Sequence, residues 1–366
     1  MENFCRTCLI NHTKINSLLL NKKNNNKNVW ILEKYLNFKD EFIIFFKQLK
    51  ELIKIFLNFY NFGKKITNEL TFSLFNNETK HAIRIQLILD KLLKKFKPKV
   101  FITTFEGFPW ERISFKTVKN YNPRIKNIGY QNVLLTKNYK SIFFKLGNEY
   151  DPDCIWLTGS TPKKLFQRSE LKQKELKIVG KLNLISNLPL KKKNGTKINK
   201  TCLVIPEGIY SECVRLFKFS FYSALKDSKN FYIWRLHPVV NKQSVLKMLN
   251  INNEENLPAN VSFSKEKNIK SDFLKSNFIL YRGSNAIISA VKHGLKPIYL
   301  EIKNEPNIDL FSLYKKTVNY VNKPEQLSNI MNNKSKLFLN RKKILRFVAE
   351  NECKMKEREI VESLKV

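Results

Sequence analysis

A short polar segment, Gly283-Ser284-Asn285, has residue types that suit a phosphate-binding site. It follows the run from Phe278 to Tyr281, whose aromatic and β-branched residues favour a buried parallel strand. Ser284 is suited to cap a helix that begins at Ala286, and Gly294 is suited to end that helix. Backbone N–H groups and a hydroxyl at the start of a helix attract anions. An ordinary strand–turn–helix connection would use the same residues, so both interpretations stay open on this segment alone.

A second candidate phosphate site is Arg235-Leu236-His237-Pro238, at the end of an aromatic run. Arg235 and His237 are two residues apart, so within a strand their side chains would point to the same side. A guanidinium and an imidazole together suit a diphosphate or phosphodiester. The alternative is a structural histidine before a proline turn.

A candidate general base, Glu106, comes just after the apolar run from Lys99 to Thr104. A carboxylate beyond the end of a parallel strand lies in the crevice where open α/β sheets bind ligands. Aromatic neighbours would raise its pKa toward a value that suits a base. Alternatively, Glu106 or Glu111 caps the helix that is expected to begin near Pro109.

Alternating strand and helix patterns are expected to position these residues. They run from about residue 99 to 180 and resume at Thr201, which predicts two parallel α/β sheets. The polar, basic stretch from Leu188 to Lys200 separates them. We therefore predict an α/β protein with two Rossmann-like, doubly wound domains that face a cleft, followed by a C-terminal helix. The predicted boundaries are 1–190 with a helical N-terminal region, a linker at 191–200, 201–335 and a helix at 336–366.

The chain is strongly basic, because 67 Lys and Arg face 31 Asp and Glu, a net charge of +36. One interpretation is an anionic partner, such as a nucleotide, a nucleic acid or acidic lipid. The other is a general over-use of Lys, Asn, Ile and Phe, as an AT-rich coding sequence would produce. A nucleic-acid-binding protein is disfavoured, since the basic residues are not concentrated on one predicted helix and no RNA-recognition, helix-turn-helix or zinc-finger pattern is present.

The N-terminus carries a candidate metal site and no secretory signal. Cys5, Cys8 and His12 are three potential zinc ligands that would need a fourth from elsewhere. Apolar stretches such as Glu41 to Tyr60 are interrupted by charges, so no membrane span is expected. We predict a cytoplasmic protein with reduced cysteines. The basic amphipathic helices of residues 40–97 suit either peripheral contact with an anionic inner membrane face or ordinary solvated helix surfaces.

The order of these features resembles a known family. A glutamate after an N-terminal-domain strand is followed by Gly129-Tyr130-Gln131, Pro206-Glu207-Gly208, the Arg-x-His-Pro segment, and a strand–Gly-Ser–helix unit that leads to Pro297-Ile298-Tyr299-Leu300. This order is similar to bacterial two-domain GT-B glycosyltransferases of surface carbohydrate synthesis, namely the sialyltransferase, polysialyltransferase and Kdo-transferase-like enzymes. More distantly it resembles the CDP-glycerol glycerophosphotransferases. The resemblance covers about Lys99 to Leu300.

The resemblance implies transfer of a sugar from a CMP-activated donor to a surface-polysaccharide, capsular, lipopolysaccharide or lipid-linked acceptor, without a metal or other cofactor. By resemblance, His237 and Pro238 match a phosphate-binding His-Pro motif, and Ser284 matches a serine motif. Glu106 is the candidate for the carboxylate that deprotonates the acceptor. The nucleoside or ribose candidates are Glu207, Gly208 and Glu301, and the acceptor-side candidates are Trp110, Tyr130 and Gln131.

The sequence departs from the family pattern at two places. Asn285 stands where a second hydroxyl would be expected, and Asn132 stands where the pattern has a histidine. The acidic-acidic-Gly motif is absent as such, with Glu106-Gly107 nearest to it and Glu207-Gly208 as the rival. A catalytically degenerate GT-B scaffold is therefore an alternative to the transferase, beside the nucleic-acid binder.

Overall fold

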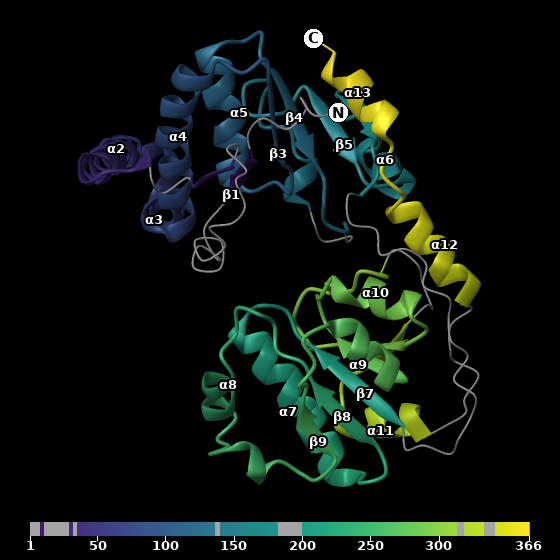
Figure 1. Cartoon of the computed structure of the whole chain (residues 1–366). Coiled ribbons are helices and arrows are strands. Elements are labelled where there is room, and N and C mark those ends of the chain that lie inside the picture. Colours follow the sequence, from purple (N-terminus) through teal and green to yellow (C-terminus); the bar gives the residue numbers. More distant parts are fainter. Residues whose placement is uncertain are drawn as a thin grey trace.

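The computed structural model describes residues 8–10, 29–31, 35–135, 140–181, 200–312, 318–332 and 341–365. They form an N-terminal and a C-terminal domain, each built on a parallel sheet with helices against it (Figure 1). The two Rossmann-like domains predicted from the alternation of strands and helices are confirmed. Most of the predicted linker at 191–200 lies outside the described residues.

Six parallel strands form the C-terminal sheet in the order β12-β11-β10-β7-β8-β9. The first of them in sequence, β7, lies at the centre, and the chain adds β8 and β9 on one side before it returns to add β10 on the other. The side of the sheet on which strands are added therefore changes between β7 and β10. Open α/β sheets bind their ligands at such a reversal of strand order. The strands are β7 (Thr201–Ile205), β8 (Phe231–Trp234), β9 (Val261–Phe263), β10 (Phe278–Tyr281), β11 (Lys296–Leu300) and β12 (Asn319–Val321).

Both faces of this sheet are covered, because successive residues of a strand belong to opposite cores. Cys202 and Val204 of β7 pack in one hydrophobic cluster, and Leu203 and Ile205 pack in the other. Strands buried on two faces need continuous apolar runs, which explains why these strands could be recognised in the sequence. The helices of this domain are α7 (Tyr210–Lys226), α8 (Lys242–Met248), α9 (Ile269–Lys275), α10 (Ala286–Lys292) and α11 (Pro324–Asn332).

The N-terminal sheet has four parallel strands in the order β3-β4-β5-β6. They are β3 (Val100–Thr104), β4 (Lys126–Tyr130), β5 (Cys154–Leu157) and β6 (Glu175–Ile178). A separate parallel pair joins β1 (Cys8–Ile10) to β2 (Val29–Ile31). The helices are α2 (Phe38–Leu57), α3 (Phe59–Phe75), α4 (Asn77–Phe96), α5 (Pro109–Tyr121) and α6 (Ser160–Phe166).

The C-terminal end of the chain packs against the N-terminal domain. The single helix expected after residue 335 is divided into α12 (Arg341–Asn351) and α13 (Glu357–Leu364). Between them, the Cys353 N–H donates to the Thr158 carbonyl at 2.8 Å, and the Lys356 N–H donates to the Val179 carbonyl at 2.8 Å. The terminal segment is thus bonded to the ends of β5 and β6, so residues beyond 350 extend the N-terminal domain.

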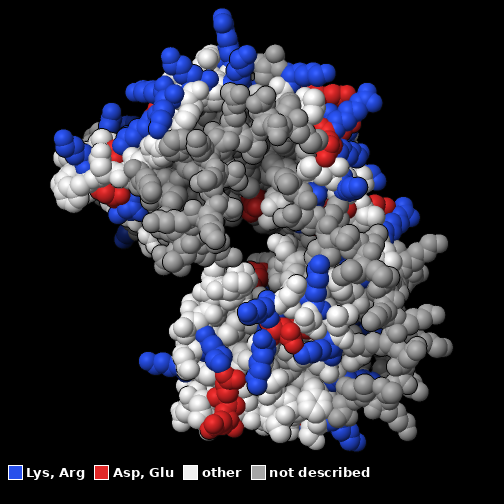
Figure 2. Space-filling view, in the orientation of Figure 1, with Lys and Arg blue, Asp and Glu red and all other residues white. Residues whose placement is uncertain are grey.

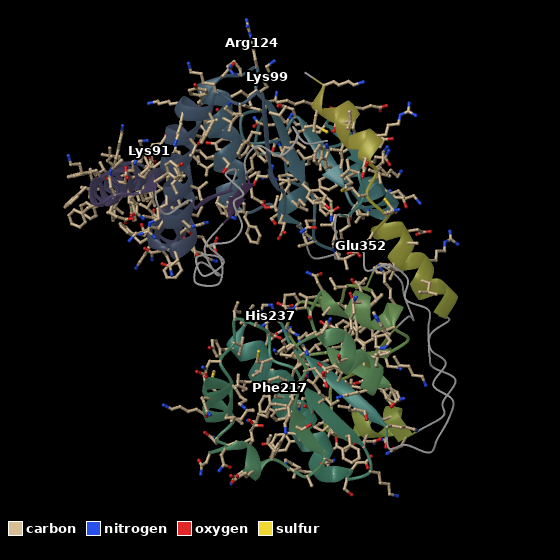
Figure 3. The ribbon with its side chains drawn as sticks, in the orientation of Figure 1. Lys91, Lys99, Arg124, Phe217, His237 and Glu352 are labelled. Atoms are coloured by element: carbon tan, nitrogen blue, oxygen red, sulfur yellow. The ribbon has the colours of Figure 1, made fainter. Side chains whose placement is uncertain are left out.

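The carboxyl edges of the two sheets face one another. Lys99 and Arg124, which precede β3 and β4, lie at the outer end of the upper domain, whereas His237, which follows β8, lies on the inner side of the lower domain (Figure 3). The space-filling view shows the surface hollowed between the domains (Figure 2). Loops that follow the strands of both sheets therefore border one space, which is the arrangement that the sequence predicted.

Candidate nucleotide site and facing carboxylate

The reversal between β7 and β10 brings together the loops that follow these two strands. The half-buried Glu207, after β7, lies directly against Gly283, after β10, since a Cβ added to Gly283 would be 1.3 Å from Glu207 Oε1. Only glycine leaves room for this contact. Burial raises the pKa of Glu207, and the nearby Glu212 carboxylate raises it further, against the opposing effect of Arg282. Two of the predicted nucleotide-site residues are thus in contact.

His237 lies beside the same loop. A Cβ added to Gly208 would be 2.9 Å from His237 Nδ1, so the imidazole rests on the Gly208 backbone. The Val239 N–H donates to Nδ1 at 3.4 Å, which favours the tautomer with its proton on Nε2. His237 and Pro238 are exposed. The structure therefore groups His237 with Glu207, Gly208 and Gly283.

The segment Ser284-Asn285 lies at the start of α10, but it does not cap the helix as expected. The helix begins at Ala286, and Asn285 precedes it with helical dihedral angles (φ −62°, ψ −19°) and no side-chain cap bond. The prediction that Ser284 is the cap is therefore wrong, because the turn closes through the Ser284 carbonyl, which accepts from the Ile287 N–H at 3.2 Å. Ser284 is half-buried and Asn285 exposed, and their contact with phosphate stays a prediction.

Arg282, which was not among the residues predicted from the sequence, is buried at this reversal, with 4% of its surface exposed. Its Nη1 donates to Glu212 Oε1 at 2.6 Å and its Nη2 donates to Glu305 Oε2 at 2.5 Å. Arg215 bridges the same two carboxylates at 2.9 and 3.0 Å. This network fixes the loop after β10 against α7 and against the loop after β11. An arginine directly after a buried strand was the signal in the sequence.

Arg235 does not join His237. Its Nη1 pairs with the buried Asp272 carboxylate and donates to the Glu266 carbonyl at 3.0 Å. Nη2 donates to the Lys267 carbonyl at 3.2 Å. The expected shared direction with His237 fails because β8 ends at Trp234, so the alternation of a strand no longer governs the next residues. Arg235 instead ties the end of β8 to the segment between β9 and α9.

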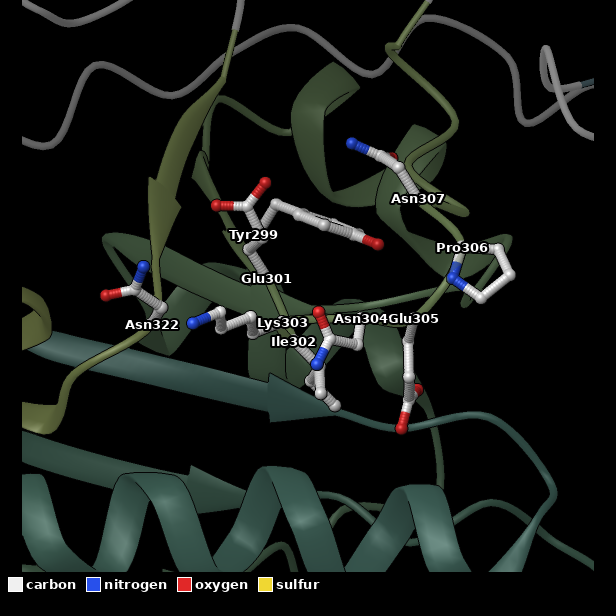
Figure 4. Close-up of a pocket in the computed structure, with 9 residues that line it drawn as sticks. All are labelled: Tyr299, Glu301, Ile302, Lys303, Asn304, Glu305, Pro306, Asn307 and Asn322. Carbon is white, nitrogen blue, oxygen red and sulfur yellow. The ribbon is translucent and has the colours of Figure 1, made fainter.

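A pocket of about 300 Å³ lies beyond the ends of β11 and β12 (Figure 4). Glu301, which was predicted to contact the ribose, lines this pocket and is exposed. Lys303 extends toward Asn322, whereas Glu305 points away from Glu301 and belongs to the Arg282 network (Figure 4). The remaining lining residues are Tyr299, Ile302, Asn304, Pro306 and Asn307. Glu305 therefore connects this pocket to the reversal.

The loop that forms the pocket is anchored by Asp309, which is fully buried. The hydroxyls of Tyr281 and Tyr320 donate to its two carboxylate oxygens at 2.5 and 2.6 Å, and the Phe311 N–H donates to it at 3.0 Å. Burial raises the pKa of Asp309, against the lowering effect of these hydrogen bonds. The anchor joins β10 and β12 to the loop, so the pocket wall is held by both strands.

Two carboxylates lie at the end of β3, and the structure separates their roles. Glu111 is fully buried in the first turn of α5 and accepts from the N–H groups of Glu106, Gly107 and Phe108 at 2.7, 2.9 and 3.0 Å. The Thr104 hydroxyl donates to its other oxygen at 2.8 Å. Glu111 is therefore the capping carboxylate. Burial raises its pKa to about 7, although these hydrogen bonds oppose the shift. Glu106 is half-buried and follows the carboxyl end of β3, two residues after Thr104.

The three acceptor-side candidates lie in different environments. Trp110 is half-buried and packs edge to face with His81 of α4, with ring centroids 6.4 Å apart. Tyr130 donates from its hydroxyl to the Gly180 carbonyl at 3.0 Å. Gln131 is fully buried, and its Oε1 accepts from the Thr158 hydroxyl at 3.2 Å. Because its side-chain amide is used in hydrogen bonds within the domain, Gln131 is not included in the proposed site.

Within the described part of the chain, no cluster of three His, Cys, Asp or Glu side chains could hold a metal ion. Cys5 and His12 of the predicted zinc site lie outside the described residues, and Cys8 begins β1. That metal site stays a prediction. Among the helices of the described ranges, none is long and apolar enough to cross a membrane.

Comparison with known proteins was made at the level of sequence and of structure. No protein-family model and no curated protein sequence matches the chain. The solved structure of the kitacinnamycin glycosyltransferase is similar over 80% of this chain and 84% of its own, with a TM-score of 0.52 at 10% identity. TarM has a TM-score of 0.46 at 14% identity over 76% of this chain, which spans 57% of the TarM chain. The UDP-GlcNAc 2-epimerase of Methanocaldococcus jannaschii, solved with UDP-GlcNAc and UDP, has a TM-score of 0.47 at 13% identity over 75% of this chain and 81% of its own.

At such low identity the similarity concerns the fold alone. It extends over both domains, since four fifths of the chain superimpose on the kitacinnamycin enzyme. The protein therefore has the GT-B type of fold, with two Rossmann-like domains whose carboxyl sheet edges face one another.

Proposed function

We propose that this protein is a glycosyltransferase that moves a sugar from a CMP-activated donor to a carbohydrate or lipid-linked acceptor. The observation that carries the proposal is the contact of Glu207, Gly283 and the His237 loop at the reversal of the C-terminal sheet. Nucleotides bind at this place in doubly wound sheets. The fold shared with a solved glycosyltransferase supports the proposal.

In the proposed reaction, an acceptor hydroxyl oxygen attacks the anomeric carbon of the donor sugar. Glu106, at the facing edge, takes the hydroxyl proton, and the bond from the anomeric carbon to the phosphate oxygen breaks. The electron pair leaves with the phosphate of CMP. The His237 Nε2–H and the backbone N–H groups near Ser284 donate to that phosphate as its charge develops, so the proposal calls for no metal.

The pocket next to the reversal supplies a place for the rest of the nucleotide. Glu301 and Lys303 offer an acceptor and a donor beside it. The Glu207 carboxylate is held against Gly283 and suits a ribose hydroxyl as hydrogen-bond acceptor. The ribose and base are proposed to lie between Glu207 and Glu301, with the phosphate toward His237.

Calorimetric titration with CMP, CDP, UMP and UDP tests the donor site. We expect the cytidine nucleotides to bind, and His237→Gln to weaken them about tenfold or more, because a hydrogen bond to a charged phosphate is lost. His293→Gln is the matched control, since His293 bonds to the Ser289 carbonyl at the other end of α10 and should leave binding unchanged. Selective binding of uridine nucleotides would retain a nucleotide-sugar enzyme and overturn the CMP donor.

A single-turnover transfer assay then tests the base. Glu106→Gln should lower the rate about a hundredfold while nucleotide binding stays at the wild-type level. Equal rates for the variant and the wild type would remove Glu106 from the mechanism. If no nucleotide binds while RNA binds with steep salt dependence, the nucleic-acid alternative replaces the transferase.

A further inference from the structure

The helical hairpin formed by α2 and α3 (Phe38–Leu57 and Phe59–Phe75) exposes an unusual number of large hydrophobic side chains. It projects from the N-terminal domain on the far side of α4 (Figure 1). Sixteen of the 33 exposed large hydrophobic side chains in the described ranges lie on it. Scattered exposed apolar residues are normal, but a contiguous set on one element marks an interaction surface.

The apolar face of the amphipathic helix α2 points toward solvent. Polar residues join α2 to α4: Asp40 accepts from Lys91 at 2.6 Å, and Glu41 accepts from Arg84 at 2.9 Å. Ile44 is the one apolar side chain of α2 that is fully buried. Gln48 is buried and donates to the Leu74 carbonyl of α3 at 2.7 Å. Apolar residues occur three or four apart along the opposite stripe, as in a helix that buries this face. The exposed stripe of α2 includes Phe38, Phe42, Phe45, Leu49, Ile53 and Phe56.

The exposed rings of the hairpin pack on one another. Phe38 lies against Phe42 with ring centroids 5.1 Å apart, and Phe59 lies against Tyr60 at 6.1 Å. On α3, Phe72 is 76% exposed and Tyr60 is 98% exposed. This concentration of aromatic side chains in water costs free energy that a partner would recover.

Lysines alternate with these apolar residues. Four are on α2, at Lys39, Lys47, Lys50 and Lys54, and an adjacent pair on α3 is formed by Lys64 and Lys65. Aromatic and aliphatic side chains interleaved with lysines are typical of helices that lie in a membrane interface, with the rings among the acyl chains and the ammonium groups at the lipid phosphates.

We propose that the α2–α3 hairpin binds the surface of an anionic lipid bilayer and lies in its interface. Neither helix of the hairpin is long and apolar enough to span a bilayer, so the hairpin is proposed to lie on the surface instead of crossing it. A second copy of this chain is disfavoured as the occupant, because each copy carries a charge of +36 and the hairpin itself presents lysines. An anionic surface has the complementary charge. The inference is independent of the proposed function.

Flotation of the full-length protein with vesicles tests the proposal. One set of vesicles is phosphatidylcholine alone, and the other has roughly one part phosphatidylglycerol to three parts phosphatidylcholine, close to a natural anionic fraction. We expect flotation with the anionic vesicles and release as salt rises. Tryptophan emission would not report insertion here, since the hairpin contains no Trp.

Two variants separate the apolar and the ionic contributions. Replacing Phe45, Phe46 and Phe56 by Ser should abolish flotation, and Leu146, Leu225 and Leu274→Ser is the matched control, with equally exposed side chains elsewhere (58–59% against 55–61%). Lys50→Gln with Lys64→Gln should weaken binding about tenfold or more, because each lysine near an anionic surface contributes separately. Lys229→Gln with Lys265→Gln removes the same charge from the C-terminal domain and should have little effect.

Several outcomes would overturn the inference. Equal flotation of the wild type and the triple Ser variant would show that another surface binds lipid. A concentration-dependent dimer that the triple Ser variant abolishes, without flotation of the wild type, would make the hairpin a self-interface. A monomer that does not float would show that no bilayer covers this face. Urea titration of the same variants is the folding control, since a variant that unfolds at the wild-type urea concentration has kept its structure.

Discussion

The two domains carry the same short pattern at the end of their first main strand, with different results. After β3 the chain reads Glu106-Gly107, with Glu111 five residues after Glu106, and after β7 it reads Glu207-Gly208, with Glu212 five residues after Glu207. In both cases the second glutamate is buried in the first turn of the next helix.

The partners of the second glutamate differ. Glu111 is surrounded by N–H groups of its own loop and by the Thr104 hydroxyl, so it closes the loop on itself. Glu212 instead pairs with Arg282 and Arg215, which belong to another loop and to α7. One carboxylate makes a self-contained turn, and the other joins two loops at the place where the sheet order reverses. The second arrangement builds a site, because it fixes groups from separate strands relative to one another.

Removing the inner carboxylate of the N-terminal loop should have the largest effect. Glu111→Ala leaves three backbone N–H groups and one hydroxyl without their acceptor in a buried position. We expect a loss of about 4 kcal/mol in the free energy of unfolding, measured by urea titration. Glu106→Ala is the control, and a similar loss there would contradict the separation of roles.

Removing the inner carboxylate of the C-terminal loop should cost somewhat less. Glu212→Ala leaves Arg282 buried, with only Glu305 as its carboxylate partner. We expect about 3 kcal/mol, at the low end for a broken buried pair, together with weaker nucleotide binding because the loop after β10 loses its support. Urea titration and calorimetry measure the two effects. Unchanged nucleotide affinity would show that this network is structural alone.

The pH dependence of stability should report the burial of Glu111 in the N-terminal loop. Because burial raises the folded-state pKa of Glu111 from 4.5 to about 7, the folded state binds the proton more tightly than the unfolded chain. Its contribution is complete below about pH 4.5 and is lost as the pH rises through 7, so the wild type should lose about 2 kcal/mol between pH 5 and 7 relative to Glu111→Gln. Denaturation curves of both proteins at these pH values measure the difference. A parallel course of the two curves would show that the hydrogen bonds outweigh burial at this carboxylate.

Much of the fold was predictable because the strands are buried on both faces. The predicted strand from Phe278 to Tyr281 has the same boundaries as β10. The predicted strand from Lys99 to Thr104 corresponds to β3, which begins one residue later, at Val100. Continuous apolar runs of this length, separated by helical patterns, leave few other arrangements. The sheet order was not predictable in this way, since it depends on which strands meet in space.

The partners of the site residues were less accessible to sequence reasoning. Arg235 was expected beside His237 by strand alternation, but its carboxylate partner, Asp272, is 37 residues away in the sequence. The role of Arg282 depends on Glu212 and Glu305, which lie 70 and 23 residues away. Local spacing indicates the element on which a residue lies. Pairing with residues distant in the sequence determines whether its charged group is neutralised within the fold or is available to a ligand.

The glycines of the two loops provide the finest test of the comparison. Gly107 has a φ of +87°, and a Cβ there would lie 2.6 Å from the Ile142 nitrogen, so both the backbone angle and fixed main-chain atoms oppose a side chain. Gly107→Ala should therefore cost about 2 kcal/mol in the free energy of unfolding.

At Gly208 the nearest atom to an added Cβ is Nδ1 of His237, on an exposed side chain that can move. Gly208→Ala should cost less than about 0.5 kcal/mol, the range of surface substitutions, yet it should weaken nucleotide binding by displacing the imidazole. Urea titration measures the free energy of unfolding of both variants, and calorimetry measures their nucleotide affinity. A large loss of stability with intact binding in Gly208→Ala would show that the two loops have the same structural role.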